Sequence, residues 1–247
     1  MRQKKEDMLL EEIRRIRHRQ PRIGGKKLYH LLKPFLEEIG LKLGRDRFFE
    51  YLRGNGMLIK RRKNYVTTTN SRHRFRIYGN MFKRHDLTGP NQVYVADITY
   101  IRTLEGFCYL SLLTDAYSRK IVGYDLSKSL GIEGSLRSLK MALRCLKGQS
   151  SGLIHHSDRG VQYCSKDYTE LLNRHRVKIS MTEKDHVYEN ALAERVNGIL
   201  KQEFMLGETL ANYDVALKMV KQSIEVYNNE RPHLSLNYQT PLICHMA

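Results

Sequence analysis

No segment of the chain is long and apolar enough to lie within a membrane. Its 247 residues contain no run of 18 apolar residues, and the first 20 residues are rich in charge. A transmembrane helix needs about 20 predominantly apolar residues, and a signal peptide needs an apolar stretch behind its charged start. We therefore expect no membrane segment, no signal peptide and a cytoplasmic protein.

Cysteine is scarce, and the residues that build common zinc or covalent sites are not grouped. The four cysteines stand apart with no Cys-x-x-Cys pair, and the ten histidines lack His-x(3–5)-His spacing beside cysteines. This pattern argues against a disulfide framework and against a structural zinc site. The sequence also offers no Ser-His-Asp or Cys-His arrangement that would supply a nucleophilic side chain. The cysteines are Cys108, Cys145, Cys164 and Cys244.

The chain instead has a large positive charge that is unevenly distributed. Its formal charge is +17. Residues 1–90 contain 24 Lys and Arg against 9 Asp and Glu, whereas residues 91–247 contain 19 against 17. A nearly neutral body with a strongly basic first third indicates a polyanionic partner, most often nucleic acid. The alternative is a basic surface that serves only solubility.

The first 63 residues have the pattern of short helices. Apolar residues recur there at helical spacing in three segments that glycines separate. The third segment follows a turn at Gly44 and carries Arg45, Arg47 and Arg53. This order predicts a helix-turn-helix DNA-binding domain over 1–63, whose last helix enters a major groove. Packing of three helices without DNA binding is the alternative.

A basic segment follows the third helix. Lys60, Arg61, Arg62 and Lys63 precede residues 64–90, in which polar residues show no periodicity and arginines alternate with aromatic side chains. We expect 64–90 to be an extended basic linker. Basic residues mixed with aromatic ones suit contact with phosphates and stacking on bases. A solvated charged linker that contacts nothing is the alternative.

From residue 91 the pattern becomes that of an α/β fold. Three strand candidates that form hairpins are followed by helices alternating with two further strands, which predicts a mixed five-stranded sheet with flanking helices. This order matches the ribonuclease-H-like fold. We expect that core over 91–205 and a C-terminal helix and tail over 206–247. The strand candidates are 92–101, 107–114, 119–126, 153–157 and 177–181.

Three acidic residues stand out in apolar surroundings. Asp97 interrupts an apolar strand, in which it shares the direction of Val93 and Val95 by period two. Asp158 ends a second strand, and Glu194 lies in a helix. Converging carboxylates repel one another unless a cation compensates them, so their natural partner is a divalent metal. Each acid alone has an ordinary explanation, as a surface strand residue, a turn residue before glycine, or part of a polar helix face.

The helix that contains Glu194 has a polar stripe. At 100° per residue, Asn190, Glu194, Asn197 and Lys201 lie along one side, and Lys201 is only about 20° from eclipsing Glu194. A metal ligand followed two turns later by a lysine that binds phosphate suits a DNA-cutting site. The alternative is an ordinary amphipathic helix with a solvated polar face.

Taken together, these residues resemble the DDE catalytic core of bacterial insertion-sequence transposases, which is related to that of retroviral integrases. Thirty-five residues separate Asp158 from Glu194, and Lys201 lies seven residues beyond. The chain departs from the family's pattern at Tyr94, where tryptophan is usual, and at 185–189, where a Gly-Asn-Cys-Tyr-Asp-like run is commoner. The resemblance rests on residues 91–94, 97–101, 156–163, 190–194 and 227–233 with Thr240-Pro241.

The resemblance implies a DNA transposase that performs metal-dependent strand cleavage and strand transfer. Asp97 and Asp158 would bind one Mg²⁺, and Glu194 with Asp97 would bind a second, with Mn²⁺ as a substitute. Such ions activate an attacking water or 3′-hydroxyl and stabilise the leaving oxygen. The residues expected to contact DNA are Lys201, Arg159, Gln162, Asn190, Arg231, His233, Arg45, Arg47, Arg53, Lys60, Arg61, Arg62 and Lys63.

Double-stranded DNA, as element ends and as target, is therefore the expected partner of a nucleoid-associated homo-oligomer. The family is often made by frameshifting between two reading frames, and this sequence resembles the downstream product, so the upstream-frame protein is a further expected partner. The alternative is a non-catalytic DNA-binding remnant or regulator of an insertion element. A plain ribonuclease-H-like nuclease would leave the C-terminal signature unexplained.

Overall fold

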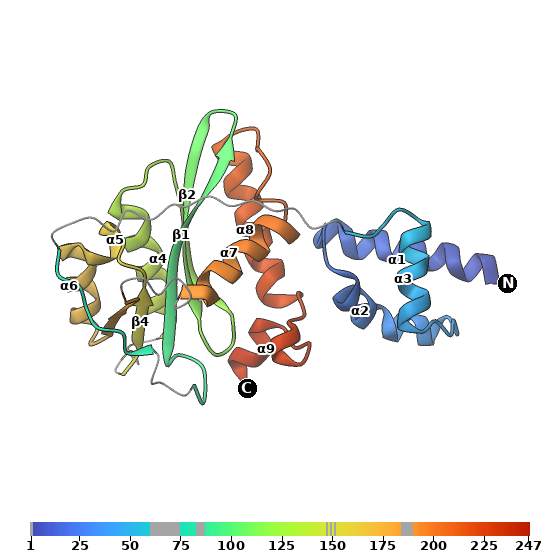
Figure 1. Ribbon diagram of the computed structural model, residues 1–247, viewed down its shortest axis with the longest axis horizontal. Coiled ribbons are helices and arrows are strands. Elements are labelled where there is room, and N and C mark those ends of the chain that lie inside the picture. The colour runs from blue at the N-terminus through green and yellow to red at the C-terminus, as the bar shows by residue number, and fades with distance from the viewer. Residues whose placement is uncertain are drawn as a thin grey trace.

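A bundle of three helices and a mixed sheet covered by helices make up the described part of the chain (Figure 1). This computed structural model describes residues 2–59, 75–82, 87–146, 148, 150, 152–183 and 190–247. The predicted DNA contacts Lys60, Arg61, Arg62 and Lys63 lie outside the described residues, as does much of the predicted linker 64–90.

The N-terminal helices have a small core of their own. Leu9, Leu28 and Phe48, one from each helix, are fully buried within it. Gly25 begins the second helix against the ring of Phe49, where an added Cβ would lie 2.8 Å from a ring carbon. This close approach explains why glycine separates the first two helices. The three helices are α1 (Arg2–Arg19), α2 (Gly25–Glu38) and α3 (Arg45–Gly54).

The sheet has five strands in the order β3-β2-β1-β4-β5. The first three strands pair antiparallel as successive hairpins, and β4 and β5 join the other side of β1 in parallel. This confirms the mixed five-stranded sheet predicted from the strand pattern. The strands are β1 (Val93–Thr103), β2 (Gly106–Asp115), β3 (Ile121–Ser127), β4 (Ile154–Ser157) and β5 (Lys178–Met181).

Helices cover both faces of the sheet (Figure 1). One face packs on the helices that precede β5 and the other on the helices that follow it. Within β1, Val93 and Val95 pack with Ala193 of the later helices, whereas Tyr94 faces the earlier ones. The helices are α4 (Ile132–Cys145), α5 (Val161–Cys164), α6 (Lys166–Arg174), α7 (Ala191–Glu203), α8 (Tyr213–Asn229), the 3-10 helix η3 (Leu234–Leu236) and α9 (Pro241–Met246).

One edge of β1 is open where the candidate acids lie. Strand β4 is short and pairs only with the first residues of β1, from Val93 to Ala96. The next described pairing on that side of β1 is the bridge between Thr103 and Leu210. Asp97 is therefore the first residue of β1 beyond its parallel neighbour, and side chains from the end of β4 and from α7 can approach it there.

The contact of α4 with β3 depends on Gly123. A Cβ built on Gly123 would lie 2.2 Å from the backbone oxygen of Ser138 and 3.0 Å from the Cβ of Ala142. We expect Gly123→Ala to lower the free energy of unfolding by about 1–3 kcal/mol, because α4 must move away from the sheet. Gly198→Ala in α7 is the matched control, since an added Cβ meets nothing within 4 Å there, and it should stabilise the helix by up to about 1 kcal/mol. Urea unfolding of both variants measures the difference, and equal effects would contradict this packing.

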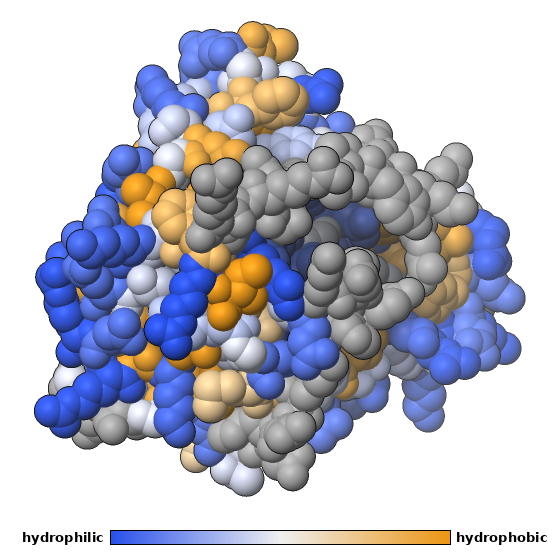
Figure 2. Space-filling model, turned by 60° about the vertical axis from the view of Figure 1, so that its left-hand side comes forward, coloured by the Kyte–Doolittle hydropathy of each residue, from blue (hydrophilic) through white to orange (hydrophobic). Residues whose placement is uncertain are grey.

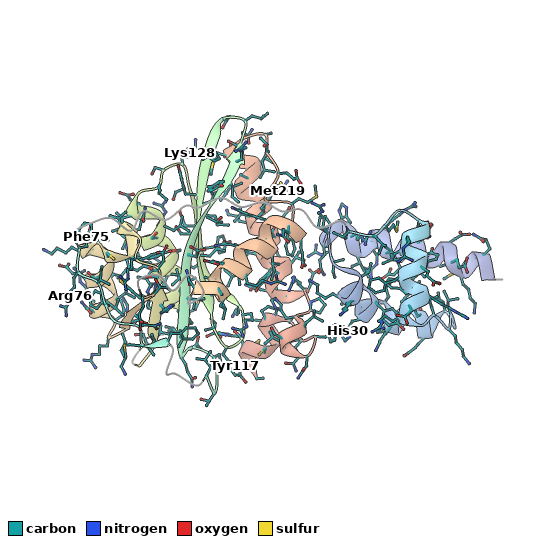
Figure 3. All side chains as sticks on the ribbon, in the orientation of Figure 1. His30, Phe75, Arg76, Tyr117, Lys128 and Met219 are labelled. Carbon is teal, nitrogen blue, oxygen red and sulfur yellow. The ribbon has the colours of Figure 1, made fainter. Side chains whose placement is uncertain are left out.

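The helical bundle contacts the C-terminal part of the core through ion pairs and a ring stack. The Lys27 Nζ lies 2.5 Å from Glu203 at the end of α7, and the exposed Arg19 pairs with Glu230. His30, labelled in Figure 3, stacks on Tyr238 with ring centroids 4.3 Å apart. Among the described residues, the three helices are thus joined to the chain segments that surround the last turn of α7.

The face of the protein drawn in Figure 2 is mainly hydrophilic. In Figure 2, hydrophilic side chains dominate the visible face and the hydrophobic residues form small separate areas. None of the helices in the described ranges has both the length and the apolar character needed to cross a bilayer.

Candidate active site

The three predicted acids come from three different elements at the open edge of β1. Asp97 follows the last residue of β1 that pairs with β4. Asp158 follows Ser157, the last residue of β4. Glu194 lies in the first turn of α7. The carboxylates of Asp158 and Glu194 both act electrostatically on Asp97, so the fold gathers the three acids that the sequence separates.

Asp97 faces α7, as its position in the strand predicts. Its Oδ2 accepts a hydrogen bond of 2.7 Å from Nδ2 of Asn197, and its Oδ1 accepts one of 3.0 Å from the Ile98 amide. Burial, and next the negative charge of Asp158, raise the pKa of Asp97 to about 7, although the bond from Asn197 opposes this shift. Asp97 therefore has oriented oxygen atoms and too little positive charge around it to ionise easily.

Asp158 and Glu194 complete the acidic group. The Oδ1 of Asp158 accepts a 2.9 Å hydrogen bond from the Gly160 amide, which fixes the carboxylate above the turn into α5. The Glu194 side chain reaches solvent, yet the protein around its carboxylate and the charge of Asp158 raise its pKa. The acids therefore repel one another, which is the electrostatic pattern of a site that takes up cations.

A cleft opens beside two of the acids. It has a volume of about 340 Å³, and Asp97 and Asp158 are among its polar lining residues. Tyr100, Tyr109 and Tyr163 contribute aromatic surface to it. Glu194 borders a second hollow of about 320 Å³ that follows α7 as far as Glu203. The site is thus an open depression along a strand edge and a helix, a shape that suits an extended polymer better than an enclosed small molecule.

The acids match a divalent metal in donor chemistry. Carboxylate oxygens are the ligands that Mg²⁺ prefers in proteins, and the raised pKa of Asp97 indicates that the described side chains leave the acidic group undercompensated. With these side-chain positions, no three His, Cys, Asp or Glu residues of the described ranges are grouped closely enough to hold one ion. The residue types fit the metal, and binding would need the carboxylates to converge further.

Lys201 lies near the acids, on the side of α7 that the helical stripe predicts. Its Nζ is 4.3 Å from the centroid of the Tyr100 ring. Burial lowers the pKa of Lys201, and the charge of Asp97 opposes that shift. Lys201 thus places a cation against the Tyr100 ring, within electrostatic reach of Asp97.

Three other predicted DNA contacts surround the acids but bind the protein backbone. The Nε of Arg159 donates to the Thr182 carbonyl at 2.7 Å, and Nε2 of Gln162 donates to the Leu130 carbonyl at 2.9 Å. Asn190 is buried and donates to the Ala96 carbonyl at 3.2 Å. Gln162 lines the cleft, whereas the Asn190 contact attaches the start of α7 to β1 next to Asp97.

Arg231 and His233 lie inside the protein, away from a surface that DNA could reach. Arg231 is 3% exposed, and its guanidinium donates from Nε and a terminal nitrogen to the two oxygens of Glu203 at 2.8 and 2.9 Å. His233 is 7% exposed and packs edge-on against the ring of Tyr227. Burial, and next the charge of Arg231, lower the pKa of His233 to about 3. Both side chains are occupied in packing.

The arginines of the helical bundle remain available. Arg45, Arg47 and Arg53 of α3 are all exposed, and Arg45 has a contact with the neighbouring Asp46. Their exposure is compatible with the expected DNA contact, which stays a prediction.

Two functional residues were missed by sequence reasoning as site residues. Asn197 lies on the predicted polar stripe of α7 and orients Asp97, so the stripe itself was the available signal. Tyr100 contacts Lys201 and lines the cleft. Its signal was weaker, because period two in β1 places Tyr100 on the opposite face from Asp97.

Comparison with known proteins identifies the family to which the chain is similar. Two family models described as "Integrase core domain" match residues 88–186 and 175–241. The "Insertion element IS600 uncharacterized 31 kDa protein" of Shigella sonnei is 37% identical over 212 residues, which cover 85% of this chain and 78% of that protein. "Transposase InsF for insertion sequence IS3A" of Escherichia coli (strain K12) is 34% identical over 184 residues, which cover 74% of this chain and 64% of that protein.

A solved structure shares the fold. A chain in "CryoEM structure of simian T-cell lymphotropic virus intasome in complex with PP2A regulatory subunit B56 gamma" aligns with a TM-score of 0.54 at 16% identity. The alignment covers 92% of this chain and 72% of that chain. At this identity the likeness concerns the fold alone, and it agrees with the ribonuclease-H-like architecture predicted from the strand order.

Proposed function

The chain belongs to the insertion-sequence transposases with an integrase core domain, and we propose that it cleaves DNA at the ends of such an element and transfers the freed 3′ ends to a target. The observation that carries this proposal is the acidic group itself. Asp97 lies at an open strand edge beside a cleft, and burial and the neighbouring acids raise its pKa to about 7. Carboxylates whose pKa is strongly raised by burial and by mutual repulsion are typical of functional sites.

Asp97, Asp158 and Glu194 are the proposed catalytic residues and the ligands of two Mg²⁺ ions, for which Mn²⁺ can substitute. When bound, such ions neutralise the acids, activate the attacking oxygen and stabilise the leaving one. The chain itself contributes orientation. Asn197 fixes the Asp97 carboxylate and the Gly160 amide fixes Asp158. Lys201 presents a cation to a DNA phosphate at the edge of the cleft.

DNA binding is assigned to two regions. In the domain division that we propose, the helical domain (1–63) binds duplex DNA through Arg45, Arg47 and Arg53 and the basic run 60–63. The linker 64–90 leads to the core (91–205). Arg159 and Gln162 form the rim of the catalytic site, whereas Asn190 is buried and attaches the start of α7 to β1 beside it, in place of the DNA contact that the sequence suggested. A homo-oligomer that brings two element ends together, and the upstream-frame protein, are the proposed partners.

We propose a structural role for Arg231 and His233 in place of the DNA contact that the sequence suggested. Their burial and the paired contact of Arg231 with Glu203 support this role. Asn228 of the C-terminal signature then also acts in folding: its Oδ1 accepts from the Ile121 amide and its Nδ2 donates to the Ile121 carbonyl.

A strand-cleavage and strand-transfer assay tests this function. The purified chain is incubated with the end sequence of its element, a target duplex and Mg²⁺, and product strands are separated by length. We expect cleavage with Mg²⁺ or Mn²⁺, none with EDTA, and none for Asp158→Ala or Glu194→Gln. Asp167→Asn, an exposed acid of α6, is the control that should cleave normally. Activity that survives Asp158→Ala would exclude the assigned site.

The alternative is a non-catalytic DNA-binding remnant or regulator, and the relatives do not favour it. A remnant would have no reason to keep the ligand chemistry and orienting contacts of the acids. Calorimetric titration with Mn²⁺ separates the enzyme from the remnant. If the chain is the proposed enzyme, the wild type binds Mn²⁺ and Asp158→Ala loses that binding. If it is a remnant, the wild type does not bind Mn²⁺.

A further inference from the structure

The β1–β2 hairpin has an aromatic face that the covering helices leave partly exposed. The hairpin extends past α4 and α7 toward the top of Figure 1. In its register Tyr100 lies opposite Tyr109, and Arg102 lies opposite Phe107, so the four side chains share one face. Phe107 is 46% exposed and Arg102 is exposed as well. Phe107 is therefore part of a contiguous aromatic surface next to a cation, and contiguous exposed patches of this kind mark interaction sites.

Rings and cations alternate along this face. The Nζ of Lys201 lies 4.3 Å from the Tyr100 ring centroid, the Tyr100 and Phe107 rings meet edge to face at 5.2 Å, and the Arg102 guanidinium carbon lies 5.3 Å from the Phe107 centroid. Tyr100 also lines the cleft that contains Asp97 and Asp158. The series therefore begins at the acidic group and leads away from it along the hairpin.

The hairpin is braced, which makes the face a firm platform. Leu210 binds the backbone at the end of β1: its amide donates to the Arg102 carbonyl and its carbonyl accepts from the Leu104 amide, at 2.9 Å each. The Thr103 hydroxyl donates to the Gly106 carbonyl at 2.8 Å. Gly106 itself has φ of 124°, which only glycine adopts without strain. A rigid aromatic surface loses little conformational entropy when a ligand stacks on it.

Unpaired nucleotides are the ligand that this chemistry selects. Bases stack on aromatic rings and on arginine planes, and the phosphates between them attract the same cations, whereas the bases of an intact duplex are already stacked on one another. We infer that the face formed by Tyr100, Arg102 and Phe107 binds the unpaired nucleotides of the DNA strand that adjoins the scissile phosphate. The inference rests on the proposed function, since it takes the strand held at the acids to continue along the hairpin.

Binding to two DNA probes in EDTA tests the inference without catalysis. One probe is a short fluorescent duplex with paired ends, and the other is the same duplex with its terminal bases mismatched. We expect the wild type to prefer the mismatched probe and Phe107→Ala to reduce that affinity about tenfold, with little change for the paired probe. Phe107→Trp should retain the preference, because an aromatic ring is kept. Arg102→Gln should weaken binding to the mismatched probe and reduce the salt dependence of that binding.

The controls are Leu104→Ala, which removes an 80% exposed apolar side chain from the same tip, and Lys128→Gln, which removes a cation from the Tyr213 ring. Neither should change the preference. Equal loss on both probes, or an unchanged preference in Phe107→Ala, would overturn the inference. So would a change in sedimentation of Phe107→Ala without DNA, which would assign the face to contact between copies of the chain. If Mg²⁺-dependent cleavage occurs without a preference for unpaired ends, the hairpin inference fails and the proposed function stands.

Discussion

Asp97→Asn is expected to abolish strand cleavage and, in the same protein, to raise the free energy of unfolding when no metal is present. The loss of cleavage follows from removing a charged ligand, since metal stabilisation of a transition state is worth several kcal/mol. Each 1.36 kcal/mol is a factor of ten in rate. The cleavage rate of the variant should therefore be at most about a thousandth of the wild-type rate. The same cleavage assay with wild type and Asp167→Asn measures this effect.

The gain in stability follows from the raised pKa of Asp97. In the unfolded chain this carboxyl ionises near its ordinary pKa of 3.8, and in the folded protein near about 7. Between these values the unfolded state releases a proton that the folded state keeps, so the wild type loses stability as the pH rises through this range. Asparagine does not ionise and can still accept the bond from Asn197. The variant loses the hydrogen bond from the Ile98 amide, because an NH₂ group replaces the accepting oxygen.

Unfolding in urea with EDTA at several pH values checks this expectation. The two proteins should differ least near pH 4, and the variant should become the more stable one as the pH approaches 8, by roughly 2–3 kcal/mol. Saturating Mg²⁺ should then reverse the order, because only the wild type gains from binding the metal. A difference that does not change with pH would show that Asp97 is not repelled by its neighbours. If Mg²⁺ stabilises both proteins equally, Asp97 is not one of the metal ligands.

The sheet and the acids were predictable because their signals are local. Alternation along β1 predicted that Asp97 shares the direction of Val93 and Val95, and the contact with Asn197 on α7 confirms it. The helical period placed Lys201 beside the acids from 100° per residue alone. Such periodicities result from backbone geometry, so they can be read from a short stretch of sequence without knowledge of the fold.

The role of the C-terminal signature was not predictable in the same way. Arg231 and His233 were expected to contact DNA because the resemblance to the transposase family implied it. Their actual neighbours are Glu203, which is 28 residues away, and Lys27, which is 204 positions earlier in the chain than Arg231. Nothing local in the sequence pairs these residues. Only the packing of the helical bundle on the end of α7 decides whether that arginine faces solvent or protein.

Glu203→Ala is expected to destabilise the protein more than any other single substitution at this contact. Glu203 accepts from Lys27 at 2.5 Å and from Arg231 at 2.8 and 2.9 Å. The side chains of Lys27 and Arg231 are only 9% and 4% exposed. Alanine would leave two buried cations facing each other without an anion, and loss of one partner from a buried pair costs on the order of 3–5 kcal/mol.

Lys27→Met should have a much smaller effect, because Arg231 keeps its paired bond to Glu203 and methionine fills a similar volume. Burial, and next the charge of Arg231, already lower the pKa of Lys27 to about 8, against the attraction of Glu203. The charged form of Lys27 is therefore less favourable in the folded protein than in the unfolded chain. Between about pH 8 and 10.5 the unfolded chain binds a proton that the folded protein does not, so wild-type stability should rise with pH in that range. Lys27→Met should lack this rise.

Urea unfolding of the two single variants and the double variant resolves the contributions. The double variant should be more stable than Glu203→Ala alone, because it removes one of the two unpaired cations. Glu230→Ala is the control, since its pair with Arg19 is exposed and surface pairs contribute little. Equal losses from Glu203→Ala and Glu230→Ala would contradict the buried network. Because Glu203 and Glu194 lie on one helix, roughly 13 Å apart at 1.5 Å per residue, a loosened last turn of α7 should also slow cleavage, and Lys27→Met should leave it unchanged.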